Sequence, residues 1–144
     1  MLKSVMCVDD DPVTLMICKV VLETSNFTQN VVTAENGKLA IDLLTSDADA
    51  PGLSLILLDL NMPVMDGWGF LDEFTSKHVE SFPNLKIIIL SSSVNPEDFK
   101  RAKNHKSVID YIQKPLTVEL IEEIKHSPHF FPFFEKTKVI SQRS

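Results

Sequence analysis

Residues 53–67 read "LSLILLDLNMPVMDG", in which the apolar run Leu53–Leu60 is interrupted near its end by Asp59 and followed by a polar loop. Nearly unbroken apolar runs are typical of strands that are buried on both faces, and such strands are usually parallel. Four further runs of this kind lie at residues 4–8, 30–34, 85–90 and 107–112. Helix signals separate them, such as Pro12 and Pro96, each suited to a first helical turn. The alternation predicts a doubly wound α/β domain with a parallel sheet.

Size and charge restrict the function classes. A chain of 144 residues with 44% hydrophobic content suits one domain with one core. A net charge of −6 argues against nucleic acid or an anionic membrane as partner. No apolar run approaches the ~18 residues needed to span a bilayer, and the amino terminus turns acidic too early for a signal peptide. Cys7 and Cys18 lie in apolar stretches, so we expect buried, reduced thiols in a cytoplasmic protein.

Four of the five predicted strands end at an aspartate, a serine or a lysine. These residues are Asp9 and Asp10 after the first strand, Asp59 at the third, Ser91 at the fourth and Lys114 at the fifth. In open parallel sheets, ligands bind outside the carboxyl ends of the strands. We therefore expect these side chains to converge on one edge of the sheet although they are far apart in sequence.

Such a convergence would place three carboxylates together. Two unit charges ~4 Å apart repel by ~4 kcal/mol at an effective dielectric near 20, so the cluster calls for a cation. Oxygen donors without cysteine or histidine suit Mg²⁺ or Mn²⁺. A carboxylate beside a divalent cation, an ammonium and a hydroxyl is equipped to become an acyl phosphate. Asp11 is better placed to cap the helix that begins at Pro12.

Four motifs, in this order, resemble one family. "VDDD", "LLDLNMPVMDG", "LSSS" and "YIQKPL" are similar to the strand-end motifs of the receiver domain of two-component response regulators, and the likeness covers residues 3–125. The resemblance implies a flavodoxin-like fold, a five-stranded parallel sheet in the order 2-1-3-4-5 with five helices. It further implies a stand-alone receiver over residues 1–126, followed by an aromatic tail at 127–144 and no output domain.

The resemblance also implies a metal site. Asp59 would accept the phosphoryl group. Asp10, Asp59 and the backbone carbonyl of Asn61 would bind Mg²⁺ or Mn²⁺, and Asp9 would act through a metal-bound water.

Three further residues take roles from the same family pattern. Ser91 would contact the phosphoryl group, although Ser92 and Ser93 compete with it for this role. Lys114 would pair with a phosphoryl oxygen. Tyr111 stands at the position of a switch aromatic, with ordinary half-buried packing as the alternative.

The implied function is that of a phosphoacceptor in a phosphorelay. The donor would be a sensor histidine kinase or a histidine phosphotransfer protein, and the signal would pass to a downstream protein that the sequence does not name. Self-dephosphorylation would be slow, and the chain would not otherwise be an enzyme. Homodimer formation stays open. We expect surface positions for all four histidines, which are His78, His105, His126 and His129.

Two other functions compete with this one. The first is a small metal-dependent phosphatase with an aspartyl nucleophile, of the haloacid-dehalogenase type. Those enzymes carry a second aspartate two residues after the nucleophile, where this chain has Asn61, and they usually need a cap domain. The second is an interaction module that works without phosphorylation.

Two segments depart from the family pattern. Arg101, Lys103 and Lys106 make a basic stretch before the fifth strand, which is either a recognition patch or a solvated helix end. The tail contains more aromatic side chains than a surface usually exposes, so they either fold back on the domain or bind a partner or second copy. These side chains are Phe130, Phe131, Phe133 and Phe134.

Overall fold

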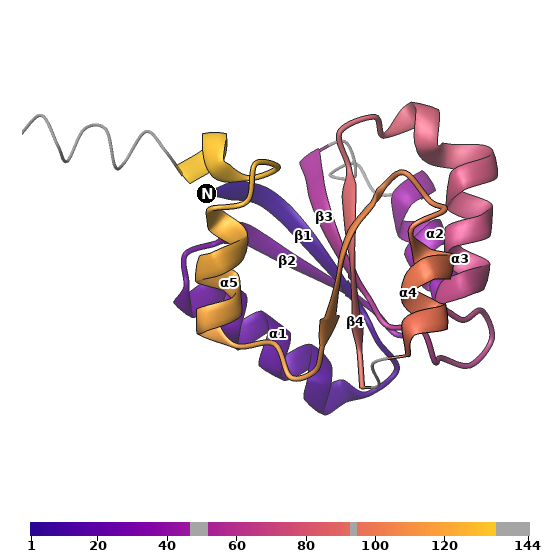
Figure 1. The fold of residues 1–144 in the computed structure, drawn as a ribbon, viewed down its shortest axis with the longest axis horizontal. Helices are drawn as coiled ribbons and strands as arrows, with labels where there is room; N and C mark the ends of the chain where they lie inside the picture. Colours follow the sequence, from indigo (N-terminus) through magenta and orange to yellow (C-terminus); the bar gives the residue numbers. More distant parts are fainter. Residues whose placement is uncertain (47–51, 93–94, 135–144) are drawn as a thin grey trace, which may run out of the picture.

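The computed structural model describes residues 1–46, 52–92 and 95–134 and shows one parallel sheet (Figure 1). Its strands are β1 (Leu2–Val8), β2 (Thr28–Ala34), β3 (Leu53–Leu58), β4 (Lys86–Ser91) and β5 (Val108–Gln113). All neighbouring strands pair in parallel, in the order β2-β1-β3-β4-β5. This confirms the predicted fold class and strand order.

Helices cover both faces of the sheet. They are α1 (Pro12–Thr24), α2 (Gly37–Ser46), α3 (Gly67–Glu73), α4 (Pro96–Ala102) and α5 (Val118–Lys125). The π-helical segment η2 (Phe74–His78) and the 3₁₀ turn η3 (Val79–Ser81) continue α3, and residues 131–134 add a helical turn to the five expected helices. Figure 1 shows α1 and α5 on one face and α2, α3 and α4 on the other. Within the described ranges, every helix is too short or too polar to cross a membrane.

Side chains at the helix starts explain where the helices begin. Asp11 accepts a hydrogen bond from the Val13 amide at 2.9 Å, as predicted for a cap of α1. Thr117 caps α5 in the same way, through the Leu120 amide at 3.2 Å. Each cap satisfies an amide that has no partner inside the helix. The cap at Asp11 matters for function because α1 begins directly after Asp9 and Asp10.

The apolar core has two layers, one on each face of the sheet. One layer packs β-strand side chains against α2, α3 and α4, and the other packs them against α1 and α5. Cys7 and Cys18 belong to the second layer, where both are buried and free.

The described part of the aromatic tail folds back onto this second layer. Phe130 is only 1% exposed, and its ring meets Phe27 edge-on with 5.9 Å between centroids. Phe134 also stacks on Phe27, with 5.5 Å between ring centroids, and Phe133 remains 52% exposed. Lys125 donates to the carbonyl of Ser25, which ties the end of α5 to the turn after α1. The rest of the tail, residues 135–144, lies outside the described residues.

The prediction of four surface histidines is wrong for two of them. The side chains of His78 and His105 are only 19% and 13% exposed. His105 Nδ1 lies 2.8 Å from Thr75 Oγ1, so this ring ties the turn before β5 to η2. Helical periodicity could not show this, because the contact joins residues from distant segments.

Candidate functional site

The carboxyl ends of four strands meet at one rim of the sheet. The residues found there are Asp9 and Asp10 after β1, Asp59 after β3, Ser91 at the end of β4 and Lys114 after β5. Backbone hydrogen bonds fix the order, because the Asp59 amide donates to Val8 O at 2.9 Å and the Lys114 amide to Ser91 O at 2.7 Å. The strand order therefore brings together the polar residues that were predicted to lie at the ends of the strands.

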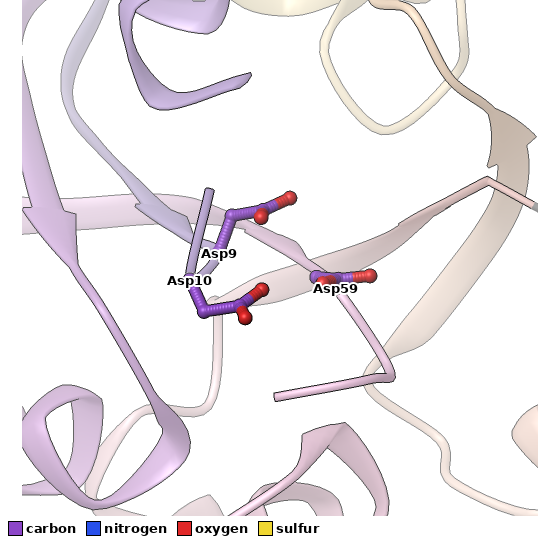
Figure 2. Close-up of side chains that lie close together, drawn as sticks. All are labelled: Asp9, Asp10 and Asp59. Atoms are coloured by element: carbon purple, nitrogen blue, oxygen red, sulfur yellow. The ribbon is translucent and has the colours of Figure 1, made fainter. Parts of the chain in front are cut away.

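Three carboxylates share this rim. Asp9, Asp10 and Asp59 each offer an oxygen, and these oxygens lie within 4.8 Å of one another (Figure 2). Asp9 and Asp59 are buried, each 4% exposed, whereas Asp10 is open to solvent. Lys114 Nζ lies 2.6 Å from Asp9 Oδ2 and 3.5 Å from Asp59 Oδ1. One ammonium thus pairs with two buried carboxylates. The cluster keeps a net negative charge, because it contains three carboxylates.

This excess is reflected in the pKa values of the two central groups. Burial, followed by the negative charge of Asp9, raises the pKa of Asp59, although Lys114 and nearby backbone amides oppose the shift. For Lys114, burial is the largest influence and lowers the pKa, but the hydrogen bonds and charges of Asp9 and Asp59 outweigh it and raise the pKa. The Lys114 ammonium therefore stays protonated. The ionised form of Asp59 is destabilised by burial and by the charge of Asp9.

Asp9 uses its two oxygens in different directions. Oδ1 accepts from the Asp11 amide at 2.9 Å, at the start of α1, while Oδ2 pairs with Lys114 after β5. Because both oxygens are engaged by protein groups, Asp9 is less available than Asp10 as a direct metal ligand. That Asp9 acts on the metal through water stays a prediction.

The donor set fits a hard divalent cation. Among the residues that the structure describes, the three aspartates are the one group of three or more potential ligating side chains, and it contains no histidine or cysteine. Carboxylate oxygens are the ligands that Mg²⁺ and Mn²⁺ prefer, and Mg²⁺ typically takes one or two of them. The residues present therefore suit the metal expected from the sequence.

Comparisons with known proteins agree with this geometry. The model of the response regulator receiver domain matches residues 5–125. This chain belongs to the response regulator receiver domain family. The probable methanogenesis regulatory protein FilR2 of Methanothrix harundinacea is 32% identical over 129 residues, which cover 84% of this chain and 80% of FilR2. Three further relatives are much longer, and the receiver spans 17, 13 and 20% of their lengths.

Solved structures show the same fold. A two-component response regulator from Cytophaga hutchinsonii superimposes with a TM-score of 0.76 at 29% identity, covering 85% of this receiver and 92% of that chain. The phosphorylated cyanobacterial phytochrome response regulator RcpA gives 0.71 at 26% identity, covering 87% and 92%. These similarities establish the fold and family of the receiver domain.

The remaining sequence-predicted residues are not part of the three-carboxylate cluster. Ser91 is buried at the end of β4, Ser92 is exposed, and Ser93 lies outside the described residues. Asn61 is exposed in the loop after β3. Tyr111 is half-buried on β5, with its ring 6.1 Å from that of Phe99 on α4, so it belongs to a different surface from the aspartates.

Two glycines position the loop that carries the site, and the sequence analysis missed this. A Cβ at Gly67 would lie 2.4 Å from the carbonyl oxygen of Asp59, so any side chain there would displace the acceptor strand. Gly37 donates its amide to Met65 O at 2.9 Å, and a Cβ there would lie 2.9 Å from the same oxygen. Gly37 is the first residue of α2 and Gly67 is the first residue of α3, which is a sequence signal. The close approach of another backbone segment to each glycine cannot be deduced from the spacing of residues.

Replacing Asp59 by Asn should stabilise the metal-free receiver by about 1–2 kcal/mol at pH 7, because a neutral amide removes a repelled buried charge. The folded pKa of Asp59 is raised above its ordinary value of 3.8, so its stabilising contribution is present below 3.8 and lost as pH rises through the folded pKa. The gain in Asp59→Asn should therefore shrink as pH falls toward 3.8. Urea unfolding in EDTA across this range measures it.

The matched control is Asp42→Asn on α2, an exposed position away from the rim, which should change stability by less than about 0.5 kcal/mol. A destabilised Asp59→Asn at neutral pH would contradict the electrostatic account.

Proposed function

We propose that Asp59 accepts a phosphoryl group from the phosphohistidine of a sensor kinase or a histidine phosphotransfer protein. The observation that carries this proposal is the shared position of Lys114, 2.6 Å from Asp9 and 3.5 Å from Asp59. A cation held beside a buried carboxylate suits the negative oxygens of an incoming phosphoryl group. Asn61, at the place of a phosphatase's second aspartate, offers no carboxylate for general acid catalysis.

In the proposed reaction, a carboxylate oxygen of Asp59 attacks phosphorus, a P–O bond forms, and the P–N bond to the donor histidine breaks. Lys114 would shift its contact from the carboxylates to a phosphoryl oxygen, and the Ser91 hydroxyl would donate to another. Mg²⁺ or Mn²⁺, held by Asp10, Asp59 and the carbonyl of Asn61 with Asp9 acting through water, would supply positive charge against the phosphoryl oxygens. Positioning and charge neutralisation account for most of the catalysis in such transfers.

Phosphorylation of Asp59 would also act at a distance, at the edge of the sheet that β5 forms. Movement of Ser91 toward the phosphoryl group would free space for Tyr111 to turn inward, and the surface of α4, β5 and α5 would change for a downstream partner. Slow hydrolysis of the acyl phosphate would end the signal. The proposal includes a receiver over residues 1–126 and a cytoplasmic location, which the free, buried Cys7 and Cys18 support.

The test uses acetyl phosphate as donor. Incubation of the protein with acetyl phosphate and Mg²⁺ should add the mass of one phosphoryl group, and hydroxylamine should remove it, as expected for an acyl phosphate. Asp59→Asn should show no adduct, EDTA should suppress the adduct on the native protein, and Asp42→Asn should behave like the native protein. Intact mass spectrometry gives the yields.

Three results would overturn the proposal. An equal yield on Asp59→Asn would remove the acceptor assignment, and rapid turnover of a simple phosphate ester without an adduct would favour the phosphatase. Absence of an adduct from the native protein, with a histidine phosphotransfer donor as well, would favour phosphorylation-independent interaction.

A further inference from the structure

Helix α1 carries an apolar stripe that faces solvent. Every other described helix or strand exposes at most one large apolar side chain, whereas α1 exposes four, by 58, 65, 38 and 56%. They are Val13, Met16, Ile17 and Val20. This spacing places them on one side of the helix, opposite to Cys18 and Leu22, which are buried in the core. A contiguous exposed apolar surface of this kind indicates a contact surface.

The described part of the C-terminal tail ends beside this helix. Phe134 stacks on Phe27 with 5.5 Å between ring centroids, and Lys125 Nζ lies 5.4 Å from the Phe134 ring. The same ammonium donates to the carbonyl of Ser25, the C-cap residue of α1. The chain beyond Phe134 therefore starts from the C-terminal end of α1.

The composition of that next stretch of chain suits the stripe. Residues 135–144 read "EKTKVISQRS". They contain two adjacent apolar side chains, Val139 and Ile140, which match an apolar surface. They also contain three cationic side chains and one anionic side chain, in a chain whose net charge is −6. This segment is therefore complementary in charge to the rest of the protein.

Length and charge also agree along the helix. α1 has 13 residues and rises about 1.5 Å per residue, so it is about 20 Å long. Ten extended residues span at most about 33–36 Å, so a segment that starts at the C-terminal end of α1 can pass its whole length. Such a segment meets Glu23 first and Asp10 and Asp11 last, and all three are exposed.

We propose that residues 135–144 pack along the outer side of α1, with Val139 and Ile140 on the apolar stripe and Arg143 toward the acidic N-terminal end of the helix. The proposal does not depend on the phosphoacceptor function. A tail that is held at Phe134 acts at a high effective concentration, because its binding is intramolecular. A second copy fits less well, since four partly exposed side chains offer less than the ~800 Å² that each partner buries in a standard interface.

A spin label on the tail tests its position in the full chain. A nitroxide attached at Gln142→Cys should strongly weaken the amide signals of α1 in two-dimensional NMR spectra. The signals of α2, on the opposite face of the sheet, should keep their intensity (Figure 1). Cys7 and Cys18 should stay unlabelled, because each is only 2% exposed. Chemical reduction of the nitroxide gives the reference spectrum.

The decisive variant is Met16→Ser with Val20→Ser, which removes two apolar side chains from the stripe. It should weaken the packing of the tail by roughly tenfold or more, so that the α1 signals recover and trypsin cuts after Lys138 faster by a similar factor. Both side chains are exposed, so the fold should be kept, and the amide spectrum verifies this. Val139→Ser with Ile140→Ser should have the same effect from the side of the tail.

The matched control is Leu39→Ser with Val64→Ser, which replaces two apolar side chains that are 42 and 80% exposed outside α1. The α1 signals should stay weakened in this variant, and the rate of tryptic cleavage should change by less than about twofold.

A mixed sample distinguishes the protein's own tail from that of a second copy. Spin-labelled protein without ¹⁵N is added to ¹⁵N-labelled protein without a nitroxide, and the α1 signals should then keep their intensity. Equal weakening in the mixed sample would assign the stripe to a second copy and overturn the proposal. Full α1 signals in the spin-labelled protein would leave the stripe to another partner. Equal weakening of α1 and α2, or equal cleavage rates in all variants, would also contradict the proposed packing.

Discussion

Phe130→Ala is expected to lower the free energy of unfolding by about 3–5 kcal/mol, the usual range for removing a buried aromatic ring. Phe130 is 1% exposed and packs edge-on against Phe27, itself fully buried, so its loss would leave a cavity that few neighbours could fill. Phe130 lies five residues beyond the end of the family match at residue 125. Urea denaturation of both proteins at the same pH gives the difference.

Phe133→Ala is the matched control, because it removes the same side chain from the same short segment at a position that is 52% exposed. We expect a loss below about 1 kcal/mol for this variant. Similar losses for Phe130 and Phe133 would show that the segment does not pack as described, and would return the aromatic tail to the role of a free binding element.

Lys114→Met is expected to destabilise the metal-free receiver by about 2–3 kcal/mol, because it leaves Asp9 and Asp59 buried without their cation. This is less than the usual loss of about 3–5 kcal/mol for a broken buried pair, because the Lys114 side chain is 18% exposed. Urea unfolding in EDTA at pH 7 measures this loss. The same variant should be phosphorylated poorly by acetyl phosphate, because no ammonium remains beside Asp59.

Two conditions separate this electrostatic effect from a loss of packing. The deficit should shrink as pH falls through the raised pKa of Asp59, because a protonated carboxyl no longer needs a cation. Added Mg²⁺ should also reduce it by binding the folded state. Lys100→Met, which removes an exposed lysine 4.0 Å from Glu97, should change stability by less than about 0.5 kcal/mol. A deficit indifferent to both pH and Mg²⁺ would assign the effect to packing.

The sequence was informative about the sheet and the acidic cluster for the same reason. Buried parallel strands are recognisable locally, and once their order is known, residues at their carboxyl ends must meet. Asp9, Asp10, Asp59 and Lys114 were therefore predictable as a set before any coordinates. The predicted third strand extended to Leu60, two residues beyond the observed end of β3 at Leu58, because an apolar residue can continue into the core after pairing stops.

Features that depend on contacts between distant segments were not predictable. Gly67 must be a glycine because the chain returns against the carbonyl of Asp59, and only coordinates show that approach. Val64 adopts φ of 69°, a left-handed conformation that β-branched residues avoid, so local preference argues against the observed backbone of this loop. The packing of the aromatic tail was likewise not predictable, because it depends on contacts with Phe27, which is about 100 residues away in the sequence.

The amino terminus of the chain lies beside the turn that follows α5, where the Met1 amino group is 3.4 Å from Phe133 O (Figure 1). This is the end of β1 opposite to Asp9, and a strand of seven residues rises about 3.3 Å per residue, or roughly 20 Å in all. A fluorophore or affinity handle attached to Met1 would therefore emerge far from the acidic rim, and could report on phosphorylation without obstructing the donor protein.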